Sequence, residues 1–479
     1  MSPRREATLA AAAAVALAGC AGAPAPAAVA EAGIHVPDHW SGPDAGATST
    51  ATVDSWWRGF GDARLDEAIA AALEHNRDLR AAAARLEAAL QDRVAAGAAS
   101  LPQVDASFDP QRSRRVFVGF PFGSGGVPSS TTTTFGISLN VRWELDVWGR
   151  VAAAESAALA DLQAVAADHA AARTSLVAQV CKAWFAVVEA RQQLDLAIAT
   201  VDAFARTEED VRDRHRRGLR PALDVHLAAN NVANAEAVVS QRRDTLQRAL
   251  RALDVLAGRY PLGDTATPQN LPSALPAVPA CLPGDLLHRR PDLVAAERRL
   301  AASGCRVDSA RAALYPRLSL TASGGTTSEE LEDLVDQDFR VWSLGANLLQ
   351  PIFRGGALRA DVARREALRA ESLATYAGTV LRAFGEVESA LASETHFGER
   401  RTALARAAEH ATQARDLARE RWQLGLADFL AVADGQRQAY LATSTLIALD
   451  RQRLDNRIDL FLALGGGFAP VPEATGANP

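Results

Sequence analysis

Few residues in this sequence have the spacing that catalysis or metal binding requires. The chain contains no GxSxG nucleophile motif, no P-loop, no HExxH zinc motif and no CxxC pair. His35 and His39 form an HxxxH pair, but Pro37 stands between them, so the two imidazoles cannot share one face of a helix. We therefore expect no enzymatic activity, no metal site and no cofactor.

Cys20 is the residue with the most specific chemical expectation. Arg4 and Arg5 precede an uncharged stretch, residues 7–19, which is too short to span a bilayer as a helix but suits the apolar region of a secretory signal. The stretch ends in Leu-Ala-Gly-Cys, which resembles the bacterial lipobox, in which the cysteine is lipidated, typically with palmitate among its acyl chains. The alternative is an ordinary signal in which Cys20 is incidental. Ala21 in place of an aspartate implies sorting to the outer membrane.

The other cysteines add little chemistry. Cys181, Cys281 and Cys305 are odd in number and lack metal-ligand spacing. Cys181 lies in a helical pattern and is most simply a packed residue. Whether Cys281 and Cys305 pair in an oxidising compartment is left open by the sequence.

Composition limits the class of protein. The 479 residues exceed one ordinary core, which predicts several domains or one elongated, repetitive unit. Lys and Arg (51) nearly balance Asp and Glu (57), giving a net charge of −6, so the basic excess of a nucleic-acid binder is missing. The N-terminal stretch is the only apolar run long enough to notice, and no run is long enough for a transmembrane helix.

Residues 134–148 alternate strictly between apolar and polar side chains. Phe135, Ile137, Leu139, Val141, Trp143, Leu145 and Val147 fall on one face. Alternation over more than about ten residues fits a transmembrane β-strand, although a long strand of a soluble sandwich has the same pattern. Shorter candidate strands lie at 104–108, 318–322 and 342–348, with polar connections at 123–126 and 329–338.

Four such strands cannot close a barrel, because the smallest single-chain barrels have about eight strands and an open edge in lipid leaves backbone groups unpaired. Several chains must then share one barrel. Two chains would supply eight strands and three would supply twelve, and a lumen favours the trimer.

The chain also repeats itself. Asn76-Arg77-Asp78-Leu79 and Arg290-Pro291-Asp292-Leu293 are 214 residues apart, and two Gly-Leu pairs that follow long helical patterns are 207 apart. This predicts two similar halves, 51–260 and 284–468, joined by a proline-rich connector at 261–283 and followed by a tail at 469–479. Residues 1–19 are then the signal and 20–50 a lipid-anchored tether.

The helical patterns are unusually long. Residues 151–217 contain neither proline nor glycine, which predicts a helix of about 100 Å. Coiled-coil spacing of apolar residues runs along it at Val180, Trp184, Val187, Leu194, Ile198 and Val201. A helix of this length suits a tube that crosses the periplasm. A periplasmic coiled-coil adaptor or scaffold would account for the helices and the lipid, but not for the strands.

Three motifs resemble one family. The segments 56–62 (WWRGFGD, with Leu65-Asp66 following), 282–292 (LPGDLLHRRPD, continuing to Glu297) and 462–468 (LALGGGF) resemble the signatures of TolC-like outer-membrane efflux factors, specifically the NodT-type lipoproteins. The resemblance implies a mainly α fold with a β-barrel portion: a homotrimer with a twelve-stranded outer-membrane barrel, four strands per chain, continued by an α-helical coiled-coil periplasmic tunnel. The connector and termini would form an equatorial belt.

The resemblance also implies functional residues. The tips that dock a periplasmic adaptor would be Gly218, Leu219, Gly425 and Leu426. The periplasmic aperture would be ringed by Leu430, Asp434 and Arg437, which share a helix face, with Asp224 helping to tether the closed state. Some members have a second acidic residue where this chain has Ala431. The sequence therefore leaves undecided how strongly the closed state is held.

We thus expect a passive conduit of a tripartite efflux system, lipid-anchored in the outer membrane and driven by an inner-membrane pump, expected to be proton-driven, through the adaptor. The alternative function is a lipid-anchored periplasmic adaptor or scaffold without a channel. Five arginines crowd the first tip, either as a solvated helix end or as a contact for an acidic adaptor surface: Arg212, Arg214, Arg216, Arg217 and Arg220. Drugs, metal ions and aromatic compounds all remain candidate substrates, although Met1 as the sole methionine excludes a methionine-lined copper path.

Overall fold

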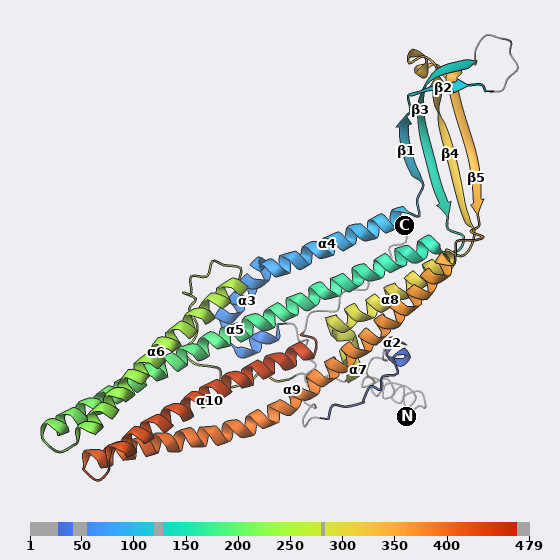
Figure 1. Cartoon of the computed structure of the whole chain (residues 1–479). Coiled ribbons are helices and arrows are strands. Elements are labelled where there is room, and N and C mark those ends of the chain that lie inside the picture. Colours follow the sequence, from blue (N-terminus) through green and yellow to red (C-terminus); the bar gives the residue numbers. More distant parts are fainter. Residues whose placement is uncertain (1–26, 42–54, 119–127, 279–282, 467–479) are drawn as a thin grey trace, which may run out of the picture. The chain divides into compact units, whose positions relative to one another are not determined.

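The computed structural model describes residues 27–41, 55–118, 128–278 and 283–466 (Figure 1). The expected signal, Cys20, most of the tether, the connection at 123–126, Cys281 and the tail lie outside the described residues. Cys305 carries a free thiol. None of the described helices combines the length and the apolar character needed to cross a membrane.

The predicted duplication is present in the lengths of the helices. Helices α4 (Arg77–Ala98) and α8 (Pro291–Ala312) each have 22 residues. The long helices α5 (Arg150–Arg216) and α9 (Ala357–Gln423) each have 67, and their return helices α6 (Ala222–Leu256) and α10 (Phe429–Ala463) each have 35. Each of these three helices of the first half therefore has a counterpart of equal length in the second.

By its internal contacts the chain forms two units, and each unit draws on both sequence halves. The first unit comprises residues 1–84, 166–295 and 377–479, and the second comprises 85–165 and 296–376. The second unit contains the sheet and the adjoining helix ends, whereas the first contains the two helical hairpins α5–α6 and α9–α10.

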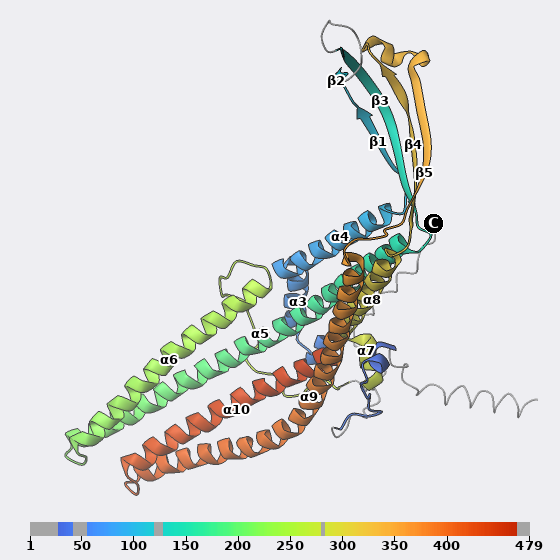
Figure 2. The same ribbon diagram turned by 45° about the vertical axis from the view of Figure 1, so that its right-hand side comes forward.

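The sheet of the second unit is antiparallel and is drawn in Figures 1 and 2. Its strands are β1 (Gln103–Phe108), β2 (Gln111–Val116), β3 (Ser129–Leu145), β4 (Arg317–Ser328) and β5 (Arg340–Leu349). The order is β1-β3-β4-β5, and β2 also pairs with β3.

The structure has five strands where the sequence predicted four, but β1 and β2 act as one. Val104 pairs with Val141 and Arg112 pairs with Thr133 in the same register. Between them Asp109 and Gly136 exchange both backbone hydrogen bonds, at 2.8 and 3.3 Å. Pro110 then interrupts the ladder because it has no N–H to donate. The sheet therefore has four columns of strands.

The register places most of the apolar residues of the four columns on one face; Val341 and Leu349 of β5 are exceptions. One row, for example, consists of Val104, Val141, Ala322 and Leu344. This face is bare in the single chain: Leu344 is 77% exposed and Trp342 is 82% exposed. The alternation predicted from residues 134–148 is therefore a property of the whole sheet.

The opposite face is polar and internally hydrogen-bonded. Ser107 lies 3.0 Å from Ser138, hydroxyl to hydroxyl, and Ser323 lies 2.8 Å from Ser343 in the same way. The four connections between strands and helices all lie at one end of the sheet. At the other end β2 is joined to β3 and β4 is joined to β5. The β4–β5 connection contains two short 3₁₀ turns, η3 (Glu332–Val335) and η4 (Gln337–Phe339).

In the first unit, the opening motif of the sequence, residues 56–62, contributes to the hydrophobic core. Its segments include η2 (Trp56–Phe60), α3 (Ala63–His75) and α7 (Pro283–Arg289). Trp56 stacks on Phe461 with ring centroids 4.9 Å apart. Asp62 caps α3 by accepting from the backbone N–H groups of its first turn, and also accepts from Trp184 Nε1 at 2.9 Å.

The glycine motif that closes the second half is also structural. Gly466 has φ +63°, and a Cβ there would lie 1.9 Å from Thr174 Cγ2, so no other residue fits without displacement. Arg290 of the middle motif forms ion pairs with Asp292 at 2.9 Å and with Glu386 at 2.5 Å.

The expected apolar stripe on α5 holds for only part of the helix. Val180, Trp184 and Val187 are buried, whereas Ile198 is 39% exposed and Ala197 is buried instead. Polar contacts to α10 replace apolar packing there, since Gln193 Nε2 donates to the Ser444 carbonyl at 2.9 Å.

Candidate functional site

The two hairpin tips have the same turn. Gly218 and Gly425 have φ of +77° and +78°, a region in which a side chain would be strained. The Leu219 N–H donates to the Arg214 carbonyl at 2.9 Å, and the Leu426 N–H donates to the Arg421 carbonyl at 2.8 Å. Both are Schellman motifs, which satisfy the last carbonyls of α5 and α9.

The turns leave apolar side chains in solvent. Leu219 and Leu426, which the sequence assigned to the tips, are 68% and 65% exposed. Leu223, beside the first turn, is exposed as well. Each tip therefore presents an apolar point to its surroundings.

A tryptophan clamp, formed by Trp422, Arg214 and Arg220, joins the two hairpins behind the tips. Trp422 of α9 is fully buried, and the guanidinium carbons of Arg214 and Arg220 lie 4.6 and 4.3 Å from its ring centroid. Arg214 Nη2 also donates to the Gln423 carbonyl at 3.3 Å. Two arginines of the first hairpin thus hold an aromatic ring of the second by cation–π contact.

The arginine cluster at the first tip was visible in the sequence, but Trp422 as the partner of Arg214 and Arg220 was not. Arg212, Arg216 and Arg217 of the same cluster form ion pairs with carboxylates on α5, Glu208 or Asp213. The cluster is therefore not a uniformly solvated patch. A single tryptophan in the charged segment RERWQLG was the available signal for the clamp.

Asp224 lies at the clamp rather than with the other predicted aperture residues. Its carboxylate is 4.0 Å from the Arg220 guanidinium, and its side chain is only 15% exposed. Arg220 Nη2 in turn lies 3.5 Å from the Ala427 carbonyl beyond the second turn. Asp224 is thus placed to orient the arginine that contacts both Trp422 and the second tip.

Leu430, Asp434 and Arg437 come together on one side of α10. Asp428 caps this helix by accepting from the Ala431 N–H at 2.9 Å. Arg437 Nη2 donates to Asp434 Oδ1 at 2.6 Å, and the two side chains are 61% and 59% exposed. Their spacing on the helix produces the shared face that the sequence predicted.

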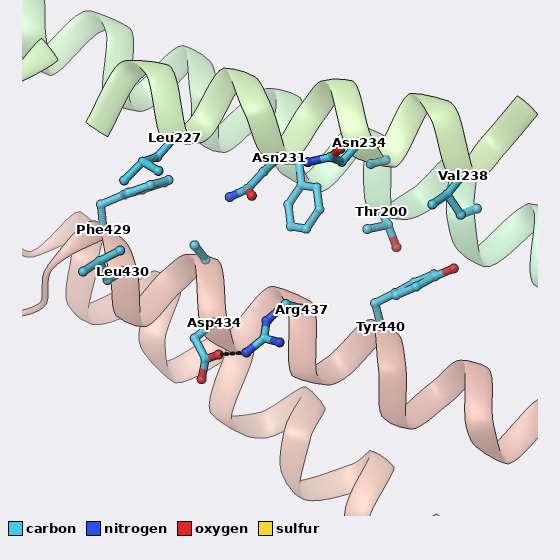
Figure 3. A pocket seen from close by; sticks show the side chains of 14 residues that line it. Thr200, Leu227, Asn231, Asn234, Val238, Phe429, Leu430, Asp434, Arg437 and Tyr440 are labelled. Carbon is cyan, nitrogen blue, oxygen red and sulfur yellow. Dashed lines mark hydrogen bonds and ion pairs between the residues drawn. The ribbon is translucent and has the colours of Figure 1, made fainter. Parts of the chain in front are cut away.

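These three residues line a cavity of about 490 Å³ between α6 and α10 (Figure 3). Leu227, Asn231 and Val238 form part of the α6 wall, and Tyr440 extends the α10 wall. The described residues contain no group of carboxylates, cysteines and histidines that could hold a metal ion.

A charged cluster farther along α10 escaped the sequence reasoning. Arg451 bridges Asp455 at 2.7 Å and Glu189 of α5 at 2.9 Å, and Lys182 pairs with Asp459 at 2.5 Å. Burial raises the pKa of Asp455 to about 6, and the positive charges of Arg451 and Lys182 only partly oppose this. The i, i+4 spacing of Arg451 and Asp455 was the only signal in the sequence.

Comparison with known proteins gives one consistent family. The model of the family described as "Outer membrane efflux protein" matches residues 68–259 and 282–466. The chain is 34% identical over 438 residues to the outer membrane protein OprJ of Pseudomonas aeruginosa, covering 90% of each chain. It is 32% identical over 441 residues to the pyoverdine export outer membrane protein OpmQ of the same species, covering 91% of this chain and 92% of that one.

The fold agrees with this result. The outer-membrane channel OprN superposes with a TM-score of 0.83 at 28% identity, covering 91% of this chain and 98% of that one. The similarity spans both units and both sequence halves.

Proposed function

This chain belongs to the outer membrane efflux protein family, and we propose from its geometry how it conducts and how it closes. It is the outer-membrane channel component of an efflux system and has the fold of channel proteins, not of an enzyme family. We infer that it is a passive conduit that hydrolyses nothing. It works with a periplasmic adaptor and an inner-membrane pump, for which we propose proton-driven transport.

The observation that carries this function is the four-column sheet. One face is apolar and exposed, the other is polar, and the two outer columns, β1–β2 and β5, have no further strand partner within the described residues. Such edges require partners in a membrane. Three chains side by side supply twelve strands and close a barrel around the polar faces.

The height of the apolar face fits a bilayer. Its rows run from Leu145 to Phe135, ten residue-to-residue steps along β3. At about 3.3 Å per residue and a tilt of about 40°, this is a band of about 25 Å, the usual apolar height of an outer-membrane barrel. At the helix end of the sheet Trp148 stacks on Tyr315 at 5.1 Å, as expected for an interfacial aromatic girdle.

For the aperture we propose that Leu430, Asp434 and Arg437 of three chains ring the pore. Each Asp434–Arg437 pair then contributes one acidic and one basic group per chain to the constriction. Outward movement of α10 relative to α6 would widen it, and the tryptophan clamp with Asp224 opposes that movement. The exposed leucines at the tips, with Gly218 and Gly425 setting the turns, are the proposed contacts for the adaptor.

The domain boundaries and the lipid anchor are further parts of this proposal. We propose a signal at 1–19, acylation of Cys20, a tether to residue 50, halves at 51–260 and 284–468, and an equatorial connector at 261–283. The anchored chain would then reside in the outer membrane with its helices in the periplasm.

Planar-bilayer conductance tests the function. Purified protein should insert as discrete channels that are mostly closed at low voltage. A lipid-anchored adaptor or scaffold would give no channels, and that result would overturn the proposal.

A further inference from the structure

Three arginines lie on the apolar face of the sheet, at the end remote from the helices. Because β1 and β2 keep one register with β3, Arg112 and Arg114 fall on the same face as Val104 and Phe108. Arg340, the first residue of β5, pairs with Thr326 and lies in the row of Phe108. We call these three side chains the outer arginines.

Their rows place Arg112 and Arg114 just beyond the apolar band, whereas Arg340, in the row of Ile137, lies within its last rows and has a side chain long enough to reach the edge. Arg112 pairs with Thr133 and Arg114 with Thr131, the first two rows beyond Phe135. Counted from Leu145, Arg112 lies about 30 Å up the barrel axis at the tilt used above, past a hydrocarbon band of about 25 Å. This is the level of the lipid headgroups in the outer leaflet.

The outer arginines have guanidinium N–H donors that a ligand can reach. All three are exposed, and none of them forms a salt bridge with another residue in the described part of the chain. Arg114 Nη2 donates to Ser129 Oγ at 3.1 Å, which fixes its direction but leaves its charge uncompensated.

We propose that the outer arginines bind the phosphate groups of phosphorylated lipids in the outer leaflet. A guanidinium offers a planar fork of donors that matches phosphate oxygens in pairs. Barrel closure strengthens the site, because β5 and β1–β2 are the two free edges and must meet across chains. Arg340 of one chain then lies beside the β1–β2 edge that carries Arg112 and Arg114 in the next. This inference rests on the barrel proposed above.

Carboxylates of a neighbouring chain are the competing partner. The β4–β5 connection carries six of them: Glu329, Glu330, Glu332, Asp333, Asp336 and Asp338. Two are already engaged within their own loop, since Asp333 accepts from Ser328 Oγ at 2.9 Å and Asp336 accepts from the Asp338 N–H at 3.1 Å. Arg112 and Arg114 follow each other along β2 on the lipid-facing surface, and this favours the lipid.

The test is equilibrium binding of diphosphorylated lipid A to the purified trimer, compared with dephosphorylated lipid A. The variant carries Arg112→Ser and Arg114→Ser together. Its matched control is Arg115→Ser, because Arg115 is exposed on the same strand but belongs to the opposite face. We expect at least about a tenfold loss of affinity for the phosphorylated lipid in the double variant and less than about twofold in the control.

Equal affinity of the double variant and wild type, equal loss in the control, or equal binding of both lipids would overturn the proposal. If the double variant dissociated into monomers, the arginines would instead be pairing with carboxylates of the neighbouring chain, and the lipid proposal would be overturned. Conductance measured on the same preparations distinguishes a failure of the lipid site from a failure of the proposed channel function. Channels with unchanged lipid affinity refute only the lipid site, whereas absence of channels in wild type refutes the proposed function.

Discussion

Removing one arginine of the tryptophan clamp should open the channel. Arg220 lies over the Trp422 ring at 4.3 Å and contacts the second tip through the Ala427 carbonyl. A partly desolvated cation–π contact contributes about 1–2 kcal/mol, so Arg220→Ala should weaken the closed state by about that amount per chain. If the three chains open together, the trimer loses about 3–6 kcal/mol, which raises the open fraction by two to four orders of magnitude until it saturates.

The assay is single-channel recording at low voltage. Arg217→Ala is the matched control, because Arg217 belongs to the same turn but forms a surface ion pair with Asp213 at 2.7 Å and is 69% exposed. Such a surface pair contributes less than about 1 kcal/mol, so this variant should stay close to wild type. An open fraction for Arg220→Ala no higher than that of Arg217→Ala would refute the clamp as a closing device.

Three further substitutions test the aperture, the buried carboxylate of α10 and the lipid anchor. Replacing Asp434 and Arg437 together by alanine should raise low-voltage conductance, and unchanged closure would remove them from the gate. Asp455→Asn should remove a pH dependence of stability: because folding raises the Asp455 pKa from 3.8 to about 6, wild type should lose about 2 kcal/mol of unfolding free energy as pH rises from 4 to 6. Denaturant unfolding of both proteins across that range measures this loss, and the same slope in wild type and variant would contradict it. Cys20→Ser should abolish incorporation of labelled palmitate, and persistent labelling would exclude this acylation site.

The sequence predicted the fold because its patterns are long and repeated. Strict alternation through Trp143 indicated a sheet with two unlike faces, and the recurring Gly-Leu pairs indicated two equal hairpins. The 67-residue length of α5 followed from its lack of proline and glycine, whereas α9 reaches the same length although it contains Gly378, Gly385 and Gly398.

The site was only partly predictable, because its contacts join segments far apart in the chain. The spacing of Leu430, Asp434 and Arg437 gave their shared face, since helix geometry is local. The Trp422 clamp depends on two hairpins meeting, and no local pattern encodes that contact. The extra strand β2 was missed because Pro110 breaks the ladder and arginines replace apolar residues in the alternation.

The two unlike faces of the sheet are the central claim, and cysteine labelling tests them directly. Single cysteines would replace Leu139 and Leu344 on the apolar face and Ser138 and Ser343 on the polar face, in a chain whose Cys181, Cys281 and Cys305 are changed to alanine. In intact outer membranes, a small membrane-impermeant maleimide should label Ser138→Cys and Ser343→Cys through the lumen and leave Leu139→Cys and Leu344→Cys unlabelled. Equal labelling of both faces would contradict a barrel embedded in lipid.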